Sequence, residues 1–141
     1  MKITKHISTQ SLPRLIIING QLDDMKYVDI GLSLSKIIES SLNSKHLALE
    51  ANDAIDTIIK DNVLHNKDIG NYIALCNIGI LFEPALHLDL HNKFRTLSKS
   101  LTLIINDNEC SINNNIFYLA NTNNKSYSIN LSDIPYNIIY L

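Results

Sequence analysis

The stretch "PRLIIINGQLDDMKYVDI" (residues 13–30) decides which kind of α/β fold this chain can form. Its first part is a run of Leu and Ile without polar alternation, which predicts a strand over residues 14–19 that is buried on both faces of a sheet. The run ends in Asn19-Gly20, as a strand does before a phosphate-binding loop. A shorter strand is predicted over residues 27–30.

The residues after Gly20 do not supply a phosphate-binding loop. A Walker loop needs G-x-x-x-x-G-K-[ST], in which backbone N–H groups wrap the phosphates, Lys reaches the terminal ones and a hydroxyl holds Mg²⁺. The next glycine is Gly31, and Lys26 is not followed by Ser or Thr. Asp23 and Asp24 would place two negative charges where the polyphosphate should lie. We therefore predict no triphosphate site here.

The link between the two predicted strands is also short. Only seven residues separate Asn19 from Tyr27, whereas a parallel crossover takes about a dozen residues or more and usually contains a helix. Two arrangements remain open. The strands form a hairpin, or they lie apart in the sheet with an extended link between them.

The middle of the chain alternates helices with buried strands. Apolar periodicity predicts helices from residue 31, over 47–60 and near 90–98, the last with Asp89 as its N-cap. Continuous apolar runs predict strands over 71–77 and 101–106. The apolar stripe of the first helix is Leu32, Leu34, Ile37, Ile38 and Leu42, and that of the second is Leu47, Ala51, Ala54, Ile55, Ile58 and Ile59.

The carboxyl-terminal part is rich in β-forming residues. "NIFYLA" (115–120) and "SYSINL" (126–131) predict a hairpin across an Asn-rich turn, and "NIIYL" (137–141) predicts a last strand. The Asn clusters 113–115 and 121–124 suit tight turns. The order of elements predicts one α/β domain over residues 1–141, a three-layer sandwich with a mainly parallel core sheet and a β-rich carboxyl-terminal hairpin.

Composition excludes several classes of protein. With 45% hydrophobic residues, 18% charged residues and no apolar run close to the roughly 18 residues of a membrane span, the chain is typical of a soluble domain. The amino terminus lacks a secretory signal, and Cys76 and Cys110 form no CxxC pair, so we expect reduced thiols and a cytoplasmic protein. The net charge of −2, without a basic cluster, predicts no direct nucleic-acid binding by the isolated chain.

Catalytic and metal-binding patterns are weak. Nucleotide hydrolases commonly end a core strand in an acid that holds Mg²⁺, but the strand over 71–77 ends in Cys76 and Asn77, poor ligands for this cation. His87 and His91 are four residues apart, but Pro84 and the Asp89 cap argue against a continuous helix that would align them on a metal. We read them as surface histidines and Cys76 as a buried apolar residue, and we assign no catalytic, metal or cofactor residue.

Four segments together resemble a known family. They are "KYVDIGLSLSKII" (26–38), "YIALCNIGILFEPALHLD" (72–89), "LTLIINDNECSINNNIFYLA" (101–120) and "SINLSDIPYNIIYL" (128–141). In order and spacing they resemble BrxF, the small P-loop protein of type-three BREX phage-defence systems. The resemblance covers roughly residues 27–141 and is strongest around 77–88. It implies a P-loop NTPase-like scaffold.

This chain departs from that family at the nucleotide site. The Walker loop and the helix after it have no counterpart, and Cys76 stands where the family has an acid. In the loop "NIGILFEP", Asn77, Phe82 and Pro84 match the family's "NIELLFDP" directly, and Glu83 matches its Asp. The resemblance therefore implies a degenerate, non-enzymatic relative that needs no cofactor, with Asn77, Phe82, Glu83 and Pro84 as candidate interaction residues.

The resemblance implies a structural or regulatory subunit of a BREX-like antiviral complex, whose partners are other proteins of that complex and in which self-association is left open. The alternative is a degenerate sensor that binds adenine nucleotide weakly without hydrolysis. For Asn77 to Phe82 two interpretations stay open: a buried helical turn capped by Asn77, or an exposed loop that docks a partner. A third interpretation of the whole chain is a small α/β interaction module unrelated to BREX.

Overall fold

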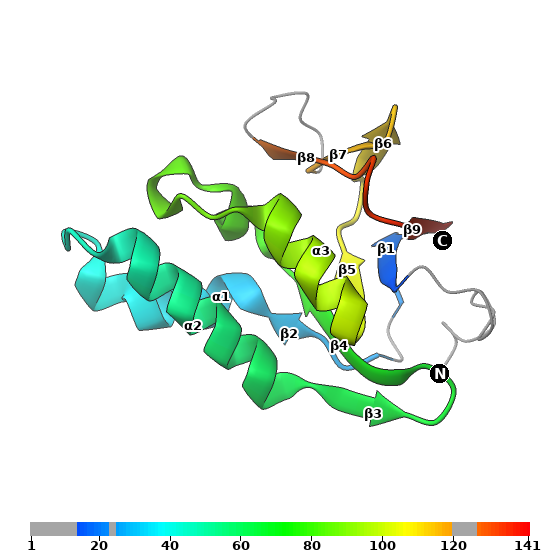
Figure 1. Ribbon diagram of the computed structural model, residues 1–141, viewed down its shortest axis with the longest axis horizontal. Helices are drawn as coiled ribbons and strands as arrows, with labels where there is room; N and C mark the ends of the chain where they lie inside the picture. The colour runs from blue at the N-terminus through cyan, green and yellow to red at the C-terminus, as the bar shows by residue number, and fades with distance from the viewer. Residues whose placement is uncertain (1–13, 23–24, 120–126) are drawn as a thin grey trace.

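The structure, a computed structural model, describes residues 14–22, 25–119 and 127–141 (Figure 1). Its strands are β1 (Leu15–Asn19), β2 (Val28–Asp29), β3 (Leu64–Asn66), β4 (Gly70–Cys76), β5 (Thr102–Asn106), β6 (Ser111–Asn113), β7 (Ile116–Tyr118), β8 (Ser128–Asn130) and β9 (Tyr136–Tyr140). Its α-helices are α1 (Ile30–Ile38), α2 (Leu47–Asn62) and α3 (Leu90–Ser100). Short 3-10 helices are η2 (Glu39–Ser41), η3 (Ile78–Phe82) and η4 (Pro84–Leu86).

The main sheet has the strand order β2-β4-β5-β1-β9, and every neighbouring pair in this path is parallel. β3 pairs antiparallel with the first half of β4, along the edge where β2 pairs with its second half. β6, β7 and β8 form a separate antiparallel sheet, at the top of Figure 1. The predicted α/β fold with a mainly parallel sheet and a β-rich carboxyl-terminal part is confirmed.

The first two strands do not form a hairpin. β4 and β5 lie between β1 and β2, so the second of the two arrangements left open by the sequence is the one adopted. The predicted β7–β8 hairpin is present, and its Asn-rich turn lies outside the described residues. Asn114 and Asn115 both have positive φ, as expected for an Asn-rich turn. Asp23 and Asp24 also lie outside the described residues.

The two faces of the sheet are covered differently. Alternate residues of a strand point to opposite faces, and Leu15 and Ile17 join a core that includes all three α-helices and the small sheet. Ile16 and Ile18 join a smaller core on the other face, where the covering side chains come from the link between β1 and β2, mainly Leu22, Met25 and Tyr27. Among the described residues, the layer on that face is a link and not a helix.

The path of the chain explains this asymmetry. From β2 through β4 and β5 to β9 the chain advances across the sheet in one direction, whereas from β1 to β2 it moves in the opposite direction. With right-handed crossovers, a reversal of direction transfers the connection to the opposite face. The link between β1 and β2 therefore crosses the second face of the sheet, where it supplies covering side chains among the described residues.

The three α-helices lie where the sequence predicts them, but the residues they bury match the predicted apolar stripes only in part. In α2 the predicted face is buried, and Asp89 caps α3 by accepting a hydrogen bond from Asn92 N. The predicted stripe of the first helix is wrong at three positions, because α1 packs against α2 through Ile30, Leu34 and Ile38. The three exposed members are Leu32, Ile37 and Leu42. No helix in the described part of the chain has the length and apolar character needed to cross a bilayer.

Candidate functional site

The carboxyl ends of the parallel strands define the edge where open α/β sheets bind their ligands. Here Asn19 ends β1, Asp29 ends β2, Cys76 ends β4 and Asn106 ends β5. The edge is therefore polar, but the only carboxylate among these terminal residues belongs to the short strand β2. Its chemistry depends on what these side chains contact.

Two of these side chains, on the paired strands β1 and β5, each hold the loop that follows the other strand. Asn19 donates from Nδ2 to the carbonyl of Cys110 at 2.7 Å and accepts from Glu109 N at 3.2 Å. Asn106 donates from Nδ2 to the carbonyl of Gly20 at 3.1 Å and contacts the hydroxyl of Tyr27 at 3.2 Å. The side-chain amides of Asn19 and Asn106 thus bond to the backbone of neighbouring loops and hold those loops against the sheet.

Gly20 lies where the first residue of a phosphate loop would lie. Its φ of +133° is a backbone conformation that residues with a side chain rarely adopt. A Cβ there would lie 2.7 Å from Cβ of Leu141, whose N–H donates to the carbonyl of Asn19 at 2.9 Å. The close approach permitted by this glycine serves the packing of the last strand.

β4 ends in Cys76, and Asn77 follows it. The thiol of Cys76 is half-buried, and its pKa is raised by burial and by the negative charge of Asp29. Asn77 is exposed, adopts a left-handed conformation with φ of 54°, and donates from Nδ2 to the Asp29 carboxylate at 2.8 Å. The prediction that Asn77 caps the following turn is wrong: it makes no capping hydrogen bond to η3, because its amide is turned toward β2.

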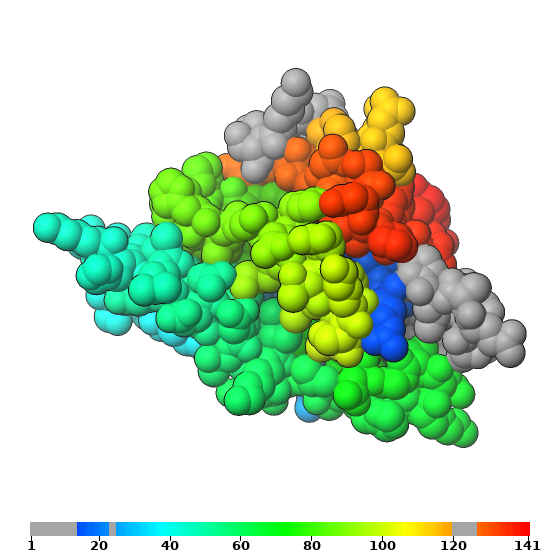
Figure 2. Space-filling model, viewed as in Figure 1, coloured from blue at the N-terminus to red at the C-terminus, as the bar shows by residue number. Residues whose placement is uncertain are grey.

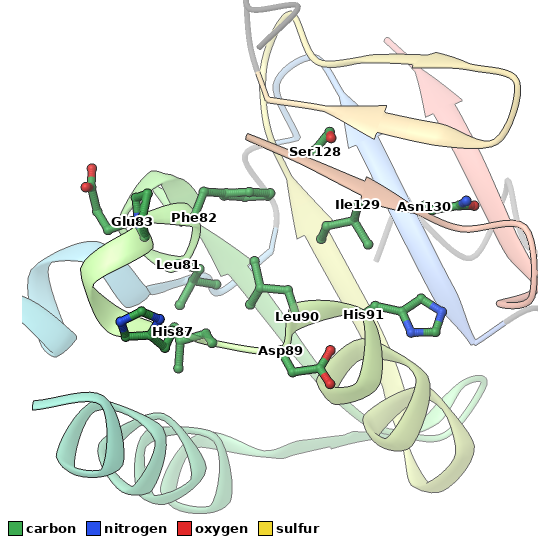
Figure 3. Close-up of a pocket in the computed structure, with 12 residues that line it drawn as sticks. Leu81, Phe82, Glu83, His87, Asp89, Leu90, His91, Ser128, Ile129 and Asn130 are labelled. Carbon is green, nitrogen blue, oxygen red and sulfur yellow. The ribbon is translucent and has the colours of Figure 1, made fainter. Parts of the chain in front are cut away.

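A pocket of about 440 Å³ lies between the segment 81–91 and β8 (Figure 3). Leu81, Phe82, Leu90 and Ile129 are buried and converge toward one another in Figure 3. The polar side chains around this apolar floor are Glu83, His87, Asp89, His91, Ser128 and Asn130. We call this site the β8 pocket.

The candidate interaction residues divide between two places. Glu83 and Pro84 are exposed at the β8 pocket, and Glu83 points away from its centre. Phe82 belongs to the floor: it is 5% exposed, and its ring stacks on Phe117 with centroids 6.4 Å apart. Asn77 does not line the pocket. The structure thus brings together three of the four predicted residues, and Ile78, Leu81 and Phe82 form the buried turn that the sequence offered as one interpretation.

The two histidines of "HLDLH" lie on different elements. His87 follows η4 with a left-handed φ of 47°, whereas His91 lies in α3 and pairs with Asp133 at 2.5 Å. This hydrogen bond lowers the pKa of Asp133, and the positive charge of Arg95 adds a smaller effect. Within the described ranges no group of three or more His, Cys, Asp or Glu side chains is arranged to hold a metal ion.

The contribution of β8 to this pocket could not be predicted from the sequence. Ser128, Ile129 and Asn130 lie about forty residues beyond the loop they face, and no motif links the two segments. Comparisons with protein-family models, with curated proteins and with solved structures found no match to this chain.

Proposed function

We propose that this protein is a non-catalytic structural or regulatory subunit of a BREX-like antiviral complex, and that it docks a partner protein at the β8 pocket. The observation that carries the docking proposal is the composition of that pocket. A dry apolar centre surrounded by polar groups is the usual composition of a protein-binding site, and here Phe82 and Ile129 lie in the floor while Glu83 and His87 lie at the exposed rim.

The backbone beside the pocket adds support. His87 holds a left-handed conformation, which costs a residue other than glycine about 1 kcal/mol or more. Such conformations cluster at binding and switch regions, where the surrounding structure offsets their cost. The strained residue lies at the rim of the pocket and is exposed, so its conformation is available to shape a contact with a partner.

The non-catalytic part of the proposal is supported by the carboxyl edge of the sheet. Asn19, Asn106 and Asn77 direct their amides to groups of the same chain. Leu141 packs directly against Gly20, with its Cβ 2.7 Å from the position that a Cβ of Gly20 would take. The defence-system context rests on the resemblance of the four segments to BrxF.

Copurification tests the proposal. The tagged chain expressed in its native host is expected to recover proteins of a BREX-like system, identified by mass spectrometry, among them a large ATPase or a methyltransferase. Glu83→Lys, which reverses a rim charge, should reduce the recovery several-fold. The matched control is Asp53→Lys, since Asp53 is equally an exposed acid but lies on α2 away from the pocket. Recovery of no defence protein, or equal loss with both variants, would count against the proposal.

Self-association is a further proposal about partners. Leu32, Ile37, Leu42 and Leu49 are each at least half exposed, and all belong to the region from α1 to α2. Light scattering of the purified chain measures the molar mass directly. A mass of twice the 15.9 kDa chain that falls to the monomer value in Leu42→Ser would support a homodimer through these residues.

The alternative is a sensor that binds adenine nucleotide weakly without hydrolysis. It is favoured by one feature, the position of Gly20 at the end of a buried central strand, where α/β sheets bind nucleotides. Calorimetric titration with ATP and Mg²⁺ separates the two functions. Saturable binding in the micromolar range would replace docking as the leading proposal.

A further inference from the structure

A second cavity, of about 360 Å³, opens between the carboxyl-terminal half of α3, the residue before β1 and the loop between β8 and β9. Its lining residues are Arg14, Arg95, Ser98, Lys99, Asp133, Ile134 and Pro135. In Figure 2 the red-orange carboxyl-terminal chain lies against the yellow-green helix α3. The cavity shares no lining residue with the β8 pocket, and the His91–Asp133 pair lies between the two. We call it the basic cavity.

The basic cavity is lined by more positive than negative side chains. Arg14, just before β1, is far in sequence from Arg95 and Lys99, which both lie on α3. None of the three makes a salt bridge to another described residue. The one carboxylate in the lining, Asp133, is hydrogen-bonded by His91. Three cations therefore face a single, already bonded carboxylate.

Arg95 has a donor that lacks an acceptor. Its Nη2 donates weakly to Oδ1 of Asn92 at 3.3 Å, but its Nε is buried and has no hydrogen-bond partner within the described residues. A buried N–H without an acceptor is costly, and in folded proteins such groups nearly always find a partner. Arg95, a lining residue of the cavity, therefore has hydrogen-bonding capacity that no described group uses.

We propose that the basic cavity binds the dianionic phosphate of a small phosphomonoester. Two positive charges in excess match one dianion, and guanidinium forks suit phosphate oxygens. The size of the cavity falls within the range of small-molecule sites, about 300–1,000 Å³. A nucleic acid is a poorer match, because its backbone needs a stripe of cations, whereas these cations meet at one cavity in a chain of net charge −2. The inference is independent of partner docking.

Two features set a limit on the affinity. The cavity lies near the carboxyl end of α3, where the helix dipole is negative; Lys99 in the last turn offsets that charge, and Leu101 N donates to the carbonyl of Leu97. The hydroxyl of Ser98 donates to the carbonyl of Arg95 at 3.1 Å, so its proton is not directed to a ligand. Binding then depends on the three cations alone.

The test is an NMR titration of the whole chain with phenyl phosphate at about pH 7.5, where a phosphomonoester with a second pKa near 6 is mostly a dianion. Saturable shifts are expected at the amides of Arg95, Ser98, Lys99 and Ile134. Benzoate has the same ring but a single negative charge, so its dissociation constant should be at least about tenfold higher than that of phenyl phosphate. Inorganic phosphate should compete at the same amides.

The variant is Arg14→Gln combined with Lys99→Gln. Both side chains are exposed, so the fold should be kept, which the unshifted remainder of the spectrum reports. Its dissociation constant for phenyl phosphate should rise by about tenfold or more, since two charge-assisted contacts are lost. Lys60→Gln, an exposed cation on α2, is the matched control and should bind as the unaltered chain does. Unsaturable shifts, equal binding of benzoate, or equal affinity of the double variant and the control would each overturn the proposal.

Discussion

The side-chain amide of Asn77 donates a 2.8 Å hydrogen bond to the carboxylate of Asp29, which joins the end of β4 to the end of β2. The same carboxylate oxygen accepts from Leu32 N at 2.9 Å and so caps α1. Asp29 thus fixes the start of the first helix to a neighbouring strand. Several measurable properties of the protein depend on this contact.

Replacing Asn77 should reveal two separate contributions to stability. Asn77→Ala is expected to lower the free energy of unfolding by about 1–2 kcal/mol, about 1 for the hydrogen bond and the remainder because alanine tolerates the left-handed backbone less well than asparagine does. Asn77→Gly should cost less, because glycine adopts the left-handed backbone freely. Urea unfolding measures both. Equal losses would show that the backbone conformation contributes nothing, and Asn43→Ala, at an exposed residue, is the control.

Stability should fall in acid through Asp29. The hydrogen bond from Leu32 N, then that from Asn77, lowers the pKa of this carboxyl below its ordinary 3.8. The unfolded chain then takes up the proton first, so the stabilisation is present above pH 3.8 and is lost as the pH falls through the lower folded pKa. Asp29→Asn, which can still cap α1, should flatten the pH dependence in that window. An unchanged slope in unfolding experiments would contradict this assignment.

Gly31→Ala should destabilise the protein, although alanine is the better helix former by about 1 kcal/mol. A Cβ at Gly31 would clash with the side-chain amide of Asn77 and would lie 2.7 Å from the backbone carbonyl oxygen of the same residue, so the helix must shift. We expect a net loss of about 1–2 kcal/mol, because overpacking costs about 1–3 kcal/mol. Gly79→Ala is the matched control: its nearest neighbour is Cδ2 of Leu119 at 3.7 Å, and thermal unfolding should hardly change.

Phe82 and Glu83 are adjacent in sequence but should give opposite results. Phe82→Ala is expected to cost about 3–5 kcal/mol, because the ring is buried and stacks on Phe117. Glu83→Ala should change stability by less than about 0.5 kcal/mol, since Glu83 is exposed. Calorimetry of both variants therefore separates the residue that builds the pocket from one that is free to contact a partner. Destabilisation by Glu83→Ala would contradict the division.

The two thiols should react at very different rates. Burial, followed by the charge of Asp107, raises the pKa of Cys110 to about 12, so almost no thiolate forms at neutral pH. The half-buried Cys76 should be alkylated first, and Cys110 only when the chain unfolds. Timed labelling with iodoacetamide and mass spectrometry of peptides measures both rates. Equal rates in the native protein would contradict the burial of Cys110.

The sequence predicts the elements of this fold better than their arrangement. Apolar runs located β1, β4 and β5, because these strands are buried on both faces of the sheet. Apolar periodicity located α2 and α3, because each helix buries one side. β3 and β6 were missed, since each has three residues and depends on its partner strand. The position of β9 beside β1 was also not predictable, because parallel pairing leaves no local signal in either strand.

The site was predictable only where it is local. Glu83 and Pro84 were named from the resemblance of the loop "NIGILFEP" to BrxF, whereas their neighbours on β8 come from tertiary packing alone. The stripe assigned to α1 failed for the same reason: periodicity counts Leu32 and Ile37 as apolar, but only packing against α2 decides which side is covered. The basic cavity had no sequence signal either, because Arg14 and Lys99 meet only after folding.

The strand order also fixes when this protein can fold during its synthesis. Leu15 pairs with Leu103 on one side and with Tyr136 on the other, so both neighbours of the first strand are translated late. Until then an uninterrupted run of four apolar residues at the amino-terminal end has no sheet to join. Such non-local pairing slows folding. A nascent chain of this protein therefore carries an unpaired apolar strand until β5 has been translated.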